Sequence, residues 1–323
     1  MDINGDAQPE VLPKITFYID VFGFCNLRCP SCPVGNIGNT SGHFQKGFMS
    51  PELLDAVLTK ANAECDVDMI GLFNWTEPLL HPDLPAVLRV ASRHSDNVMV
   101  SSNLNRLRDP YGIMQHAPAR FRVSVSGFNQ DVYSRAHREG NIEQVKLNMR
   151  TLANAKRETG ANVDLEVLYH RYNYNRCDEA EMRSYAESLG YRFETCWAMY
   201  MPAEKILTYR GRDEFGLIIS EHDRELLSTL SIDLNSALEA AKQIPHSECV
   251  LFNNQIVLDV NADVYLCCGT TSAFSNKIGN YLDLSISDIQ LKKGLNNLCG
   301  PCMVERVHQY FVHQDIFARS AEY

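Results

Sequence analysis

FGFCNLRCPSCP, at residues 22–33, follows directly on a run that is typical of a β-strand, Lys14–Asp20. The stretch carries Cys25, Cys29 and Cys32, with three residues between the first two and two between the last two. Cysteine thiolates hold iron–sulfur clusters. Three thiolates on a four-iron cluster leave one iron with an open position, which is where metal centres carry out chemistry. We therefore interpret this loop as an iron–sulfur site around which the rest of the chain is organised.

Two other interpretations of the loop are open. Structural zinc normally takes four ligands, and the loop offers no fourth cysteine and no histidine before His43. The cysteines could also be buried without any metal, but packing alone does not call for this spacing.

Composition excludes several classes of protein. Of the 323 residues, 45% are hydrophobic and 22% are charged, and the formal net charge is −10. The sequence has no basic run of the kind that contacts nucleic-acid phosphates. No apolar run reaches the roughly 20 residues of a membrane helix, and the N-terminal residues lack the apolar core of a secretory signal. We expect a cytoplasmic protein that binds neither nucleic acid nor membranes.

Cysteine usage points to metal. The chain has 11 cysteines, and without a secretory signal metal binding explains them better than disulfides do. Apart from the loop, a second group gathers toward the C-terminus: Cys249, Cys267, Cys268, Cys299 and Cys302.

Strands alternate with helices along the first 200 residues. Helices are predicted to begin after Ser50 and to cover Pro82–Ser95, Arg108–Ala117, Ile142–Thr159 and Asp178–Leu189. After Lys14–Asp20, strands are predicted at Asp68–Phe73, Asn97–Ser101, Arg120–Val125, Asp164–Tyr169 and Arg192–Ala198. This alternation indicates parallel βαβ units. Six units fall short of the eight of a closed barrel. We predict an α/β fold with an open or partial barrel, which binds ligands at the carboxyl ends of its strands.

The pattern changes after Tyr200. Residues 201–220 are predicted to be irregular, and helices are predicted at Glu221–Leu230 and Asn235–Ile244. Gln255–Val260 and Asp263–Leu266 are predicted to form a hairpin whose second strand leads into Cys267. Further predictions are a tight turn at residues 299–302 and a last helix at Val304–Ser320.

The three-cysteine loop resembles the signature of the radical S-adenosylmethionine (radical SAM) family. The resemblance implies a partial (β/α)6 barrel and a four-iron cluster whose open iron binds SAM. It also implies an electron donor such as flavodoxin or ferredoxin, and a 5′-deoxyadenosyl radical that takes a hydrogen atom from the substrate. One position departs from the pattern, because many members have an aromatic residue near the adenine where this chain has Ser31.

Further residues resemble the family's SAM contacts. Trp75-Thr76-Glu77-Pro78 follows the second strand, as does the motif that contacts the SAM ammonium. An ordinary strand-to-helix loop is the alternative. Arg135 or Arg138 could pair with the SAM carboxylate, or be an exposed helix arginine. Small polar residues at the ends of the third and fourth strands complete the predicted cofactor site: Ser102, Asn103, Ser124 and Ser126.

The second cysteine group allows two interpretations. Cys249, Cys267, Cys299 and Cys302 could form a structural zinc site. They also resemble the twitch domain, a short form of the SPASM domain, which implies one auxiliary 4Fe–4S cluster. On this resemblance the chain divides into an N-terminal extension (1–13), the barrel (14–200), a helical connector (201–244) and a small α+β cluster domain (245–323).

The resemblance implies hydrogen abstraction from a small polar molecule, sugar-like or aminocyclitol-like, that ends in oxidation or epimerisation. For epimerisation, Cys268 or, with less support, Cys196 could return hydrogen to the substrate. Candidate bases lie on or after the fifth and sixth strands: Glu166, Tyr169, His170 and Tyr200. The alternatives are the same chemistry on a ribosomally made peptide, and a metal-binding protein that is not an enzyme.

Overall fold

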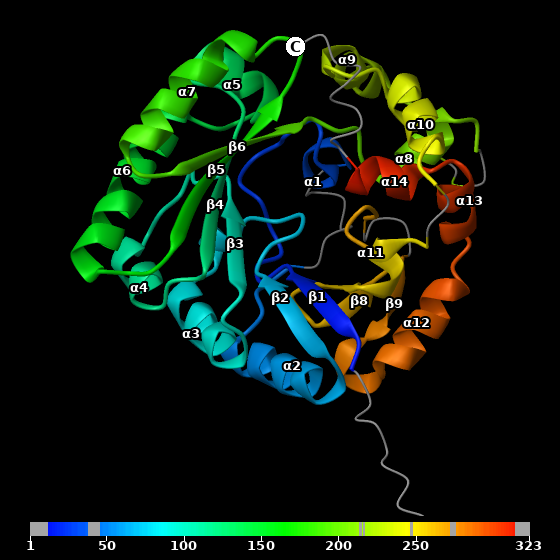
Figure 1. Ribbon diagram of the computed structural model, residues 1–323, viewed down its shortest axis with the longest axis horizontal. Helices are drawn as coiled ribbons and strands as arrows, with labels where there is room; N and C mark the ends of the chain where they lie inside the picture. The colour runs from blue at the N-terminus through cyan, green and yellow to red at the C-terminus, as the bar shows by residue number, and fades with distance from the viewer. Residues whose placement is uncertain are drawn as a thin grey trace, which may run out of the picture.

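The computed structural model describes residues 12–37, 46–212, 215, 217–245, 248–271 and 276–313. Its centre is an open sheet in the strand order β6-β5-β4-β3-β2-β1-β7-β8-β9 (Figure 1). The first six strands pair in parallel. They are β1 (Lys14–Ile19), β2 (Asp66–Gly71), β3 (Val98–Ser102), β4 (Arg120–Val125), β5 (Asp164–Arg171) and β6 (Arg192–Trp197). The prediction of an α/β fold with an open partial barrel is confirmed.

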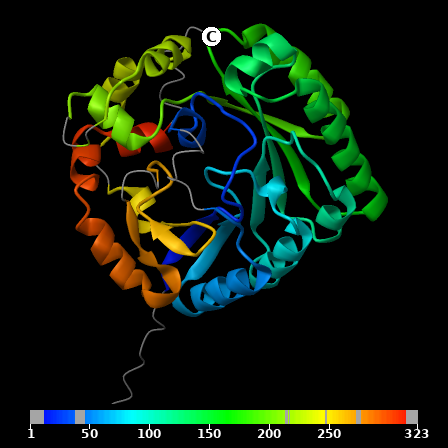
Figure 2. The same ribbon diagram turned by 180° about the vertical axis from the view of Figure 1, so that it is seen from behind.

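Helices surround the outer face of the curved sheet, as Figures 1 and 2 show from opposite sides. On β4, Phe121, Val123 and Val125 are fully buried in the main core, whereas Arg122 and Ser124 on the other face are half-buried. The apolar face of β4 therefore packs in the core, and its polar face lies on the other side of the sheet, where Ser124 lines a pocket. The helices are α2 (Pro51–Glu64), α3 (Leu84–His94), α4 (Pro110–Gln115), α5 (Gln130–Ala136), α6 (Ile142–Thr159) and α7 (Arg176–Ser188).

The C-terminal strands extend the same sheet. β7 (Gln255–Leu258) pairs in parallel with β1, and β8 (Asp263–Tyr265) and β9 (Lys277–Asn280) follow in antiparallel order. The predicted hairpin is therefore confirmed, and it lies against the first strand of the barrel. Beside it, a second core packs around Ile206, Leu238 and Val307. Its helices are α8 (Ala203–Tyr209), α9 (Glu221–Thr229), α10 (Leu234–Lys242) and α14 (Val307–Val312).

Three predictions after residue 200 are wrong. Residues 201–220, predicted to be irregular, contain α8, because Ile206 and Leu207 are apolar residues that are fully buried in the second core. Residues 299–302 do not form an isolated tight turn but begin α13 (Cys299–Val304). The last helix does not run on from Val304, because Arg306 takes a left-handed conformation with φ 61° and separates α13 from α14. The rest of that predicted helix, after His313, lies outside the described residues.

Several helices were not predicted, among them α5 and α12. α5 is short, and its Asn129 N-cap is held by Asp178 of α7, which accepts hydrogen bonds from the backbone N–H groups of Phe128 and Asn129 at 2.7 and 2.8 Å. α12 (Ile286–Gly294) begins with a capping box between Ser285 and Asp288. No helix in the described part of the chain is both long enough and apolar enough to cross a bilayer.

Gly127 generates a prediction about the packing of α5. A β-carbon at this position would lie 2.6 Å from the backbone nitrogen of Tyr133 and 2.8 Å from its Cα. We expect Gly127→Ala to lower the free energy of unfolding by about 1–3 kcal/mol, because the methyl group overpacks a backbone that cannot move aside cheaply. Chemical denaturation measures this.

Gly294→Ala is the matched control, since its β-carbon would meet only the Phe252 ring, at 3.9 Å. We expect this control to stay within about 0.5 kcal/mol of the wild type. Equal effects of the two substitutions would contradict the close packing at Gly127.

Candidate functional site

Cys25, Cys29 and Cys32 line one pocket at the carboxyl ends of the parallel strands. The pocket contains about 820 Å³ of empty space, including its open mouth. We call it the three-thiol pocket. Residues at the ends of β3, β4 and β5 and in the segments after β2, β3, β4 and β5 complete its wall, among them Trp75, Thr76, Glu77, Ser102, Asn103, Ser124, Ser126, His137, His170 and Tyr172. The structure therefore brings together all the predicted cofactor residues except Arg135.

Backbone contacts fix the cysteine loop. Gly35 of α1 (Pro33–Ile37) packs so closely that a β-carbon there would fall 2.1 Å from the carbonyl oxygen of Cys29. The Arg28 guanidinium donates to the carbonyls of Cys25 and Leu27 at 2.9 and 2.8 Å. These contacts hold the loop that carries the three thiols in place.

The sulfur atoms lie in a buried environment and have polar neighbours. The Leu27 N–H donates to Cys25 Sγ at 3.5 Å, and the Asn103 amide donates to it at 3.8 Å. Burial raises the pKa of the Cys32 thiol to about 11 and holds that of Cys29 well above its ordinary value. Such thiols are protonated near neutral pH, so a bound metal must displace their protons.

The donor set fits a cluster better than a single ion. Within the described residues, no three His, Cys, Asp or Glu side chains lie close enough to bind one metal ion. Zinc with Zn–S bonds of about 2.3 Å needs sulfurs that converge on one point. In a four-iron cluster each thiolate binds a different iron, so thiols spread around a shared pocket suit it.

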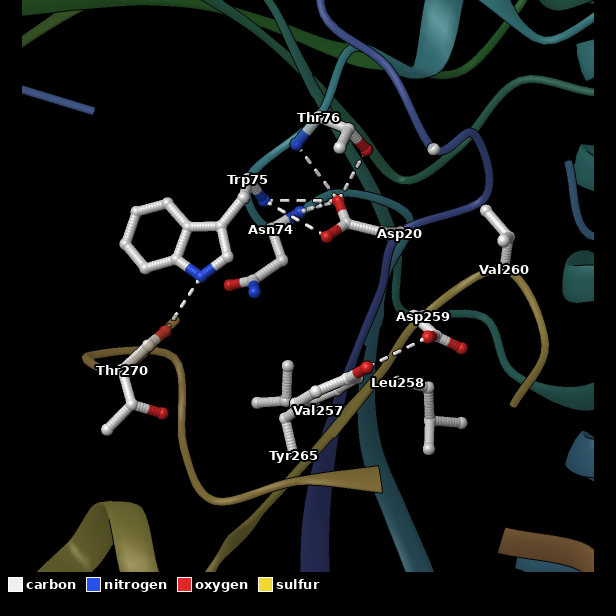
Figure 3. Close-up of a pocket in the computed structure, with 11 residues that line it drawn as sticks. Asp20, Asn74, Trp75, Thr76, Val257, Leu258, Asp259, Val260, Tyr265 and Thr270 are labelled. Carbon is white, nitrogen blue, oxygen red and sulfur yellow. Dashed lines mark hydrogen bonds between the residues drawn. The ribbon is translucent and has the colours of Figure 1, made fainter. Parts of the chain in front are cut away.

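Asp20, directly after β1, shapes the loop after β2. Its carboxylate accepts hydrogen bonds from the backbone N–H groups of Asn74, Trp75 and Thr76 at 3.0–3.1 Å, and from the Thr76 hydroxyl at 2.7 Å (Figure 3). Burial raises the pKa of Asp20 to about 6, although these hydrogen bonds favour its charged form. Asp20 was not predicted as a site residue, and its place at a strand end is the one signal that could have found it.

Glu77 ties the same loop to β3. Its carboxylate accepts from the Ser102 hydroxyl at 2.7 Å, from the Asn103 N–H at 2.9 Å and from the Leu79 N–H at 3.0 Å. The last contact caps the short helix η1 (Pro78–Leu80). Burial raises the pKa of Glu77 to about 7. Both carboxylate oxygens are therefore engaged by the protein, which gives Glu77 a positioning role in this structure.

His137, after α5, was not predicted either. Its ring stacks on Tyr133 with centroids 4.7 Å apart, Nε2 lies 3.0 Å from the Ser126 hydroxyl, and Nδ1 lies 3.7 Å from Cys29 Sγ. Burial lowers the pKa of His137 to about 3, so the ring is neutral. His170, predicted as a candidate base, also lines the pocket, and burial lowers its pKa to about 4.

Tyr172 lies next to Ser31. Its hydroxyl lies 3.1 Å from the Ser31 hydroxyl, and its ring stacks on Tyr174 with centroids 5.2 Å apart. The chain therefore places an aromatic ring from the end of β5 beside the position where the signature usually has an aromatic residue. This contact could not be predicted from the sequence, because the two residues are 141 positions apart.

Other predicted residues lie elsewhere. Arg135 lines a neighbouring pocket rather than the three-thiol pocket. Cys196 is next to His170 in the β5–β6 register. Cys268 lies with the second cysteine group, and its N–H donates to Gln255 Oε1 at 2.9 Å. Tyr169 and Tyr200 are fully buried core residues, and Glu166 is paired with Arg122 and Arg192.

Cys249, Cys267, Cys299 and Cys302 line a second pocket, which has about 440 Å³ of empty space. We call it the four-thiol pocket. Its other walls are mainly apolar, from α11 (Val250–Asn253), α13 and neighbouring segments. Lys293 of α12 is 1% exposed and lies among these thiols, where its ammonium donates to the Gln255 carbonyl at 2.6 Å. This buried cation was not predicted.

One loop joins the two pockets. The Trp75 indole N–H donates to the Thr270 carbonyl at 2.9 Å, and Trp75 lines the three-thiol pocket while Thr270 follows Cys267 (Figure 3). The Ala203 N–H donates to the Gly269 carbonyl at 2.8 Å. The positions of the two thiol sets are therefore coupled through residues 267–271.

Comparison with known proteins identifies relatives at the level of family and fold. The family model of the radical SAM superfamily matches residues 19–181. No curated protein sequence matches the chain. Among solved structures, Streptococcus suis SuiB bound to its precursor peptide SuiA is 12% identical, with a TM-score of 0.61 over 91% of this chain and 70% of that one.

Two further structures show the same likeness. SuiB bound to S-adenosylmethionine is 11% identical, with a TM-score of 0.58 over 85% of this chain, which spans 65% of that chain's length. The native enzyme anSMEcpe with bound AdoMet is 13% identical, with a TM-score of 0.54 over 85% of this chain and 80% of that one. At these identities the likeness shows a common fold. Because the family match covers half of the chain, including the cysteine loop and the strands whose ends form the three-thiol pocket, the chain belongs to the radical SAM superfamily.

Proposed function

We propose that this radical SAM enzyme oxidises a small polar substrate, sugar-like or aminocyclitol-like, and holds one auxiliary 4Fe–4S cluster in addition to the cluster that binds SAM. The observation that carries the proposal is the separation of the thiols into two sets. Three thiols share a pocket with polar strand ends, and four share a pocket with mainly apolar walls. Three thiolates leave one iron of a four-iron cluster open for a further ligand, whereas four thiolates occupy all four irons.

The three-thiol pocket has the features that SAM requires. With a cluster held by Cys25, Cys29 and Cys32 and with SAM bound, the site would supply radical chemistry that removes a hydrogen atom from the substrate. The backbone N–H groups of Trp75 and Thr76 are taken by Asp20, so these residues would offer their carbonyl groups to the ammonium at the methionine end of SAM. Ser102, Asn103, Ser124 and Ser126 offer polar groups at strand ends. The Tyr172 ring beside Ser31 offers a stacking surface for the adenine.

The buried ammonium of Lys293 is evidence that the four-thiol pocket holds a negatively charged group. A buried ammonium is costly unless opposite charge is near, and the thiols of Cys267, Cys299 and Cys249 counteract the lowering of the Lys293 pKa by burial. Four thiolates around a cluster supply such charge. We place the auxiliary cluster here, in a segment similar to a twitch domain, and expect a flavodoxin or ferredoxin as the electron donor.

The positions of the two extra thiols favour oxidation over epimerisation. Neither Cys268 nor Cys196 lines the three-thiol pocket. Cys268 lies with the four-thiol group, whereas Cys196 neighbours His170, which does line the pocket. If hydrogen is returned to a substrate radical, Cys196 is therefore the better candidate, which reverses the order expected from sequence.

Peptide modification is the second candidate. SuiB has been solved with its precursor peptide SuiA and shares the fold of this chain with a TM-score of 0.61. An assay against a short peptide encoded beside the gene would separate the two substrate classes. Product formation from the peptide would favour this candidate over a small polar substrate.

Iron counting tests the proposal directly. We expect about eight irons per chain after anaerobic reconstitution, since each cluster holds four. Dithionite should then drive cleavage of SAM. The triple variant Cys25→Ala, Cys29→Ala, Cys32→Ala should retain about four irons and lose cleavage. About four irons in the wild type, or no SAM cleavage, would refute the two-cluster enzyme.

Gly35→Ala tests the loop without removing a ligand. The added methyl group must displace Cys29, because its carbonyl would lie only 2.1 Å away. We expect this variant to lose the iron of the three-thiol pocket and SAM cleavage, and to keep the iron of the four-thiol pocket. Gly294→Ala serves again as the control. Full iron content in Gly35→Ala would show that the loop is not held as described.

Lys293→Met tests the second pocket. Loss of a nearby positive charge disfavours the reduced state, so we expect the reduction potential of the auxiliary cluster to fall, on the order of the ~59 mV that a tenfold change in a one-electron equilibrium represents. Potentiometric titration followed by electron paramagnetic resonance measures it. Lys292→Met, an exposed lysine on the same helix, is the matched control. An unchanged reduction potential would show that Lys293 does not act on the auxiliary cluster.

A further inference from the structure

A second polar pocket adjoins the three-thiol pocket, between α5 and α9. It contains about 660 Å³ of empty space, including its open mouth, and we call it the arginine pocket. Its lining includes Arg135, Arg138, Tyr172, Tyr174, His222 and Glu225. The pocket is thus lined by two guanidinium groups, two phenol rings and an imidazole. Among these six residues, only one carries a carboxylate.

Arg135 is held in place but has no anionic partner. Its guanidinium lies 3.6 Å from the centroid of the Tyr174 ring, and Tyr174 is in turn stacked on Tyr172. Within the described residues Arg135 forms no ion pair and no hydrogen bond. Arginine that is stacked on an aromatic ring keeps its N–H groups free for planar recognition of a carboxylate or phosphate.

The second arginine is only partly neutralised. Arg138 lies 3.6 Å from Glu225, which also lies 3.7 Å from His222. The Glu225 side chain is 65% exposed, so solvent screens its charge and the pair is weak. The pocket therefore keeps an excess of positive charge in a chain whose net charge is −10.

The arginine pocket is attached to the cysteine loop. Tyr172 is a wall of both pockets, and its hydroxyl reaches Ser31 between Cys29 and Cys32. The Arg28 N–H donates to the Arg138 carbonyl at 3.1 Å, which ties the end of α5 to the same loop. A ligand in the arginine pocket would lie beside the three-thiol pocket, on the other side of Tyr172.

We propose that the arginine pocket binds an oxyanion group of the substrate, a phosphate ester or a carboxylate, and so holds the rest of the substrate toward the three-thiol pocket. The inference rests on the proposed function and narrows it to substrates that carry such a group. Arg135 supplies the bidentate contact, Arg138 adds charge, and His222 adds a hydrogen bond. This assignment differs from the expectation that Arg135 pairs with the carboxylate of SAM.

Binding of simple anions to the full-length protein tests the assignment without any iron. Inorganic phosphate and acetate are titrated separately by isothermal calorimetry into wild type, Arg135→Gln and Arg150→Gln. Arg150, which also lies near a tyrosine ring on a barrel helix, is the matched control. We expect Arg135→Gln to weaken the preferred anion at least tenfold and Arg150→Gln to leave it unchanged. The tighter of the two anions identifies the substrate group as phosphate or carboxylate.

Two results would overturn the inference. One is a wild-type protein that binds neither anion, or binds them as well after Arg135→Gln. The other is a matching loss of SAM affinity in reconstituted Arg135→Gln, which would assign this arginine to the cofactor. Anion binding that depends on Arg135 in a protein that does not cleave SAM would refute the proposed function and leave the anion site standing.

Discussion

The parallel pairing of β1 with β2 on one side and β7 on the other is the constraint on which the rest of the structure depends. Because parallel strands end at the same edge of a sheet, this pairing brings the cysteine loop after β1, the loop after β2 and the turn after β7, at residues 259–262, to one edge. Each of these three segments would be an ordinary loop if the strands paired in another order. Cys267 follows antiparallel β8 and therefore lies at the other edge, near Gln255 at the start of β7. Residues 267–271 link that edge back to the loop after β2, because the Trp75 indole N–H donates to the Thr270 carbonyl at 2.9 Å.

Two buried carboxylates give the site its shape. Asp20 gathers three consecutive backbone N–H groups, and Glu77 joins the loop after β2 to the end of β3. Burial raises the pKa of both side chains toward neutrality, to about 6 and about 7. Their hydrogen bonds favour the charged forms and so offset part of the cost of burying these carboxylates, while they hold the loops in place. The polar residues of the barrel therefore include a layer that positions the residues of the pocket.

Much of this arrangement could be predicted from sequence. The six strands of the barrel follow from apolar runs at regular spacing, and the cysteine loop from three thiols that no packing argument requires. What could not be predicted depends on contacts between distant segments. α8 is stable because Ile206 and Leu207 enter a core made by later helices, and Lys293 becomes a buried cation only once α12 lies against the thiols. Arg135 was expected at the cofactor, but the ring of Tyr174, 39 positions away in sequence, holds it in another pocket.

The pairing of β7 with β1 bears on whether the C-terminal segment can be separated from the barrel. Without β7, one whole side of β1 would present unpaired backbone N–H and C=O groups next to fully buried residues such as Phe17 and Ile19. Exposed strand edges of this kind pair with other chains and promote aggregation. A chain cut before residue 245 would therefore not leave a barrel that merely lacks the four-thiol pocket. It would leave β1, now at the centre of the sheet, as an unpaired edge strand that can pair with other chains. The segment that carries the second set of thiols therefore also protects the barrel from association with copies of itself.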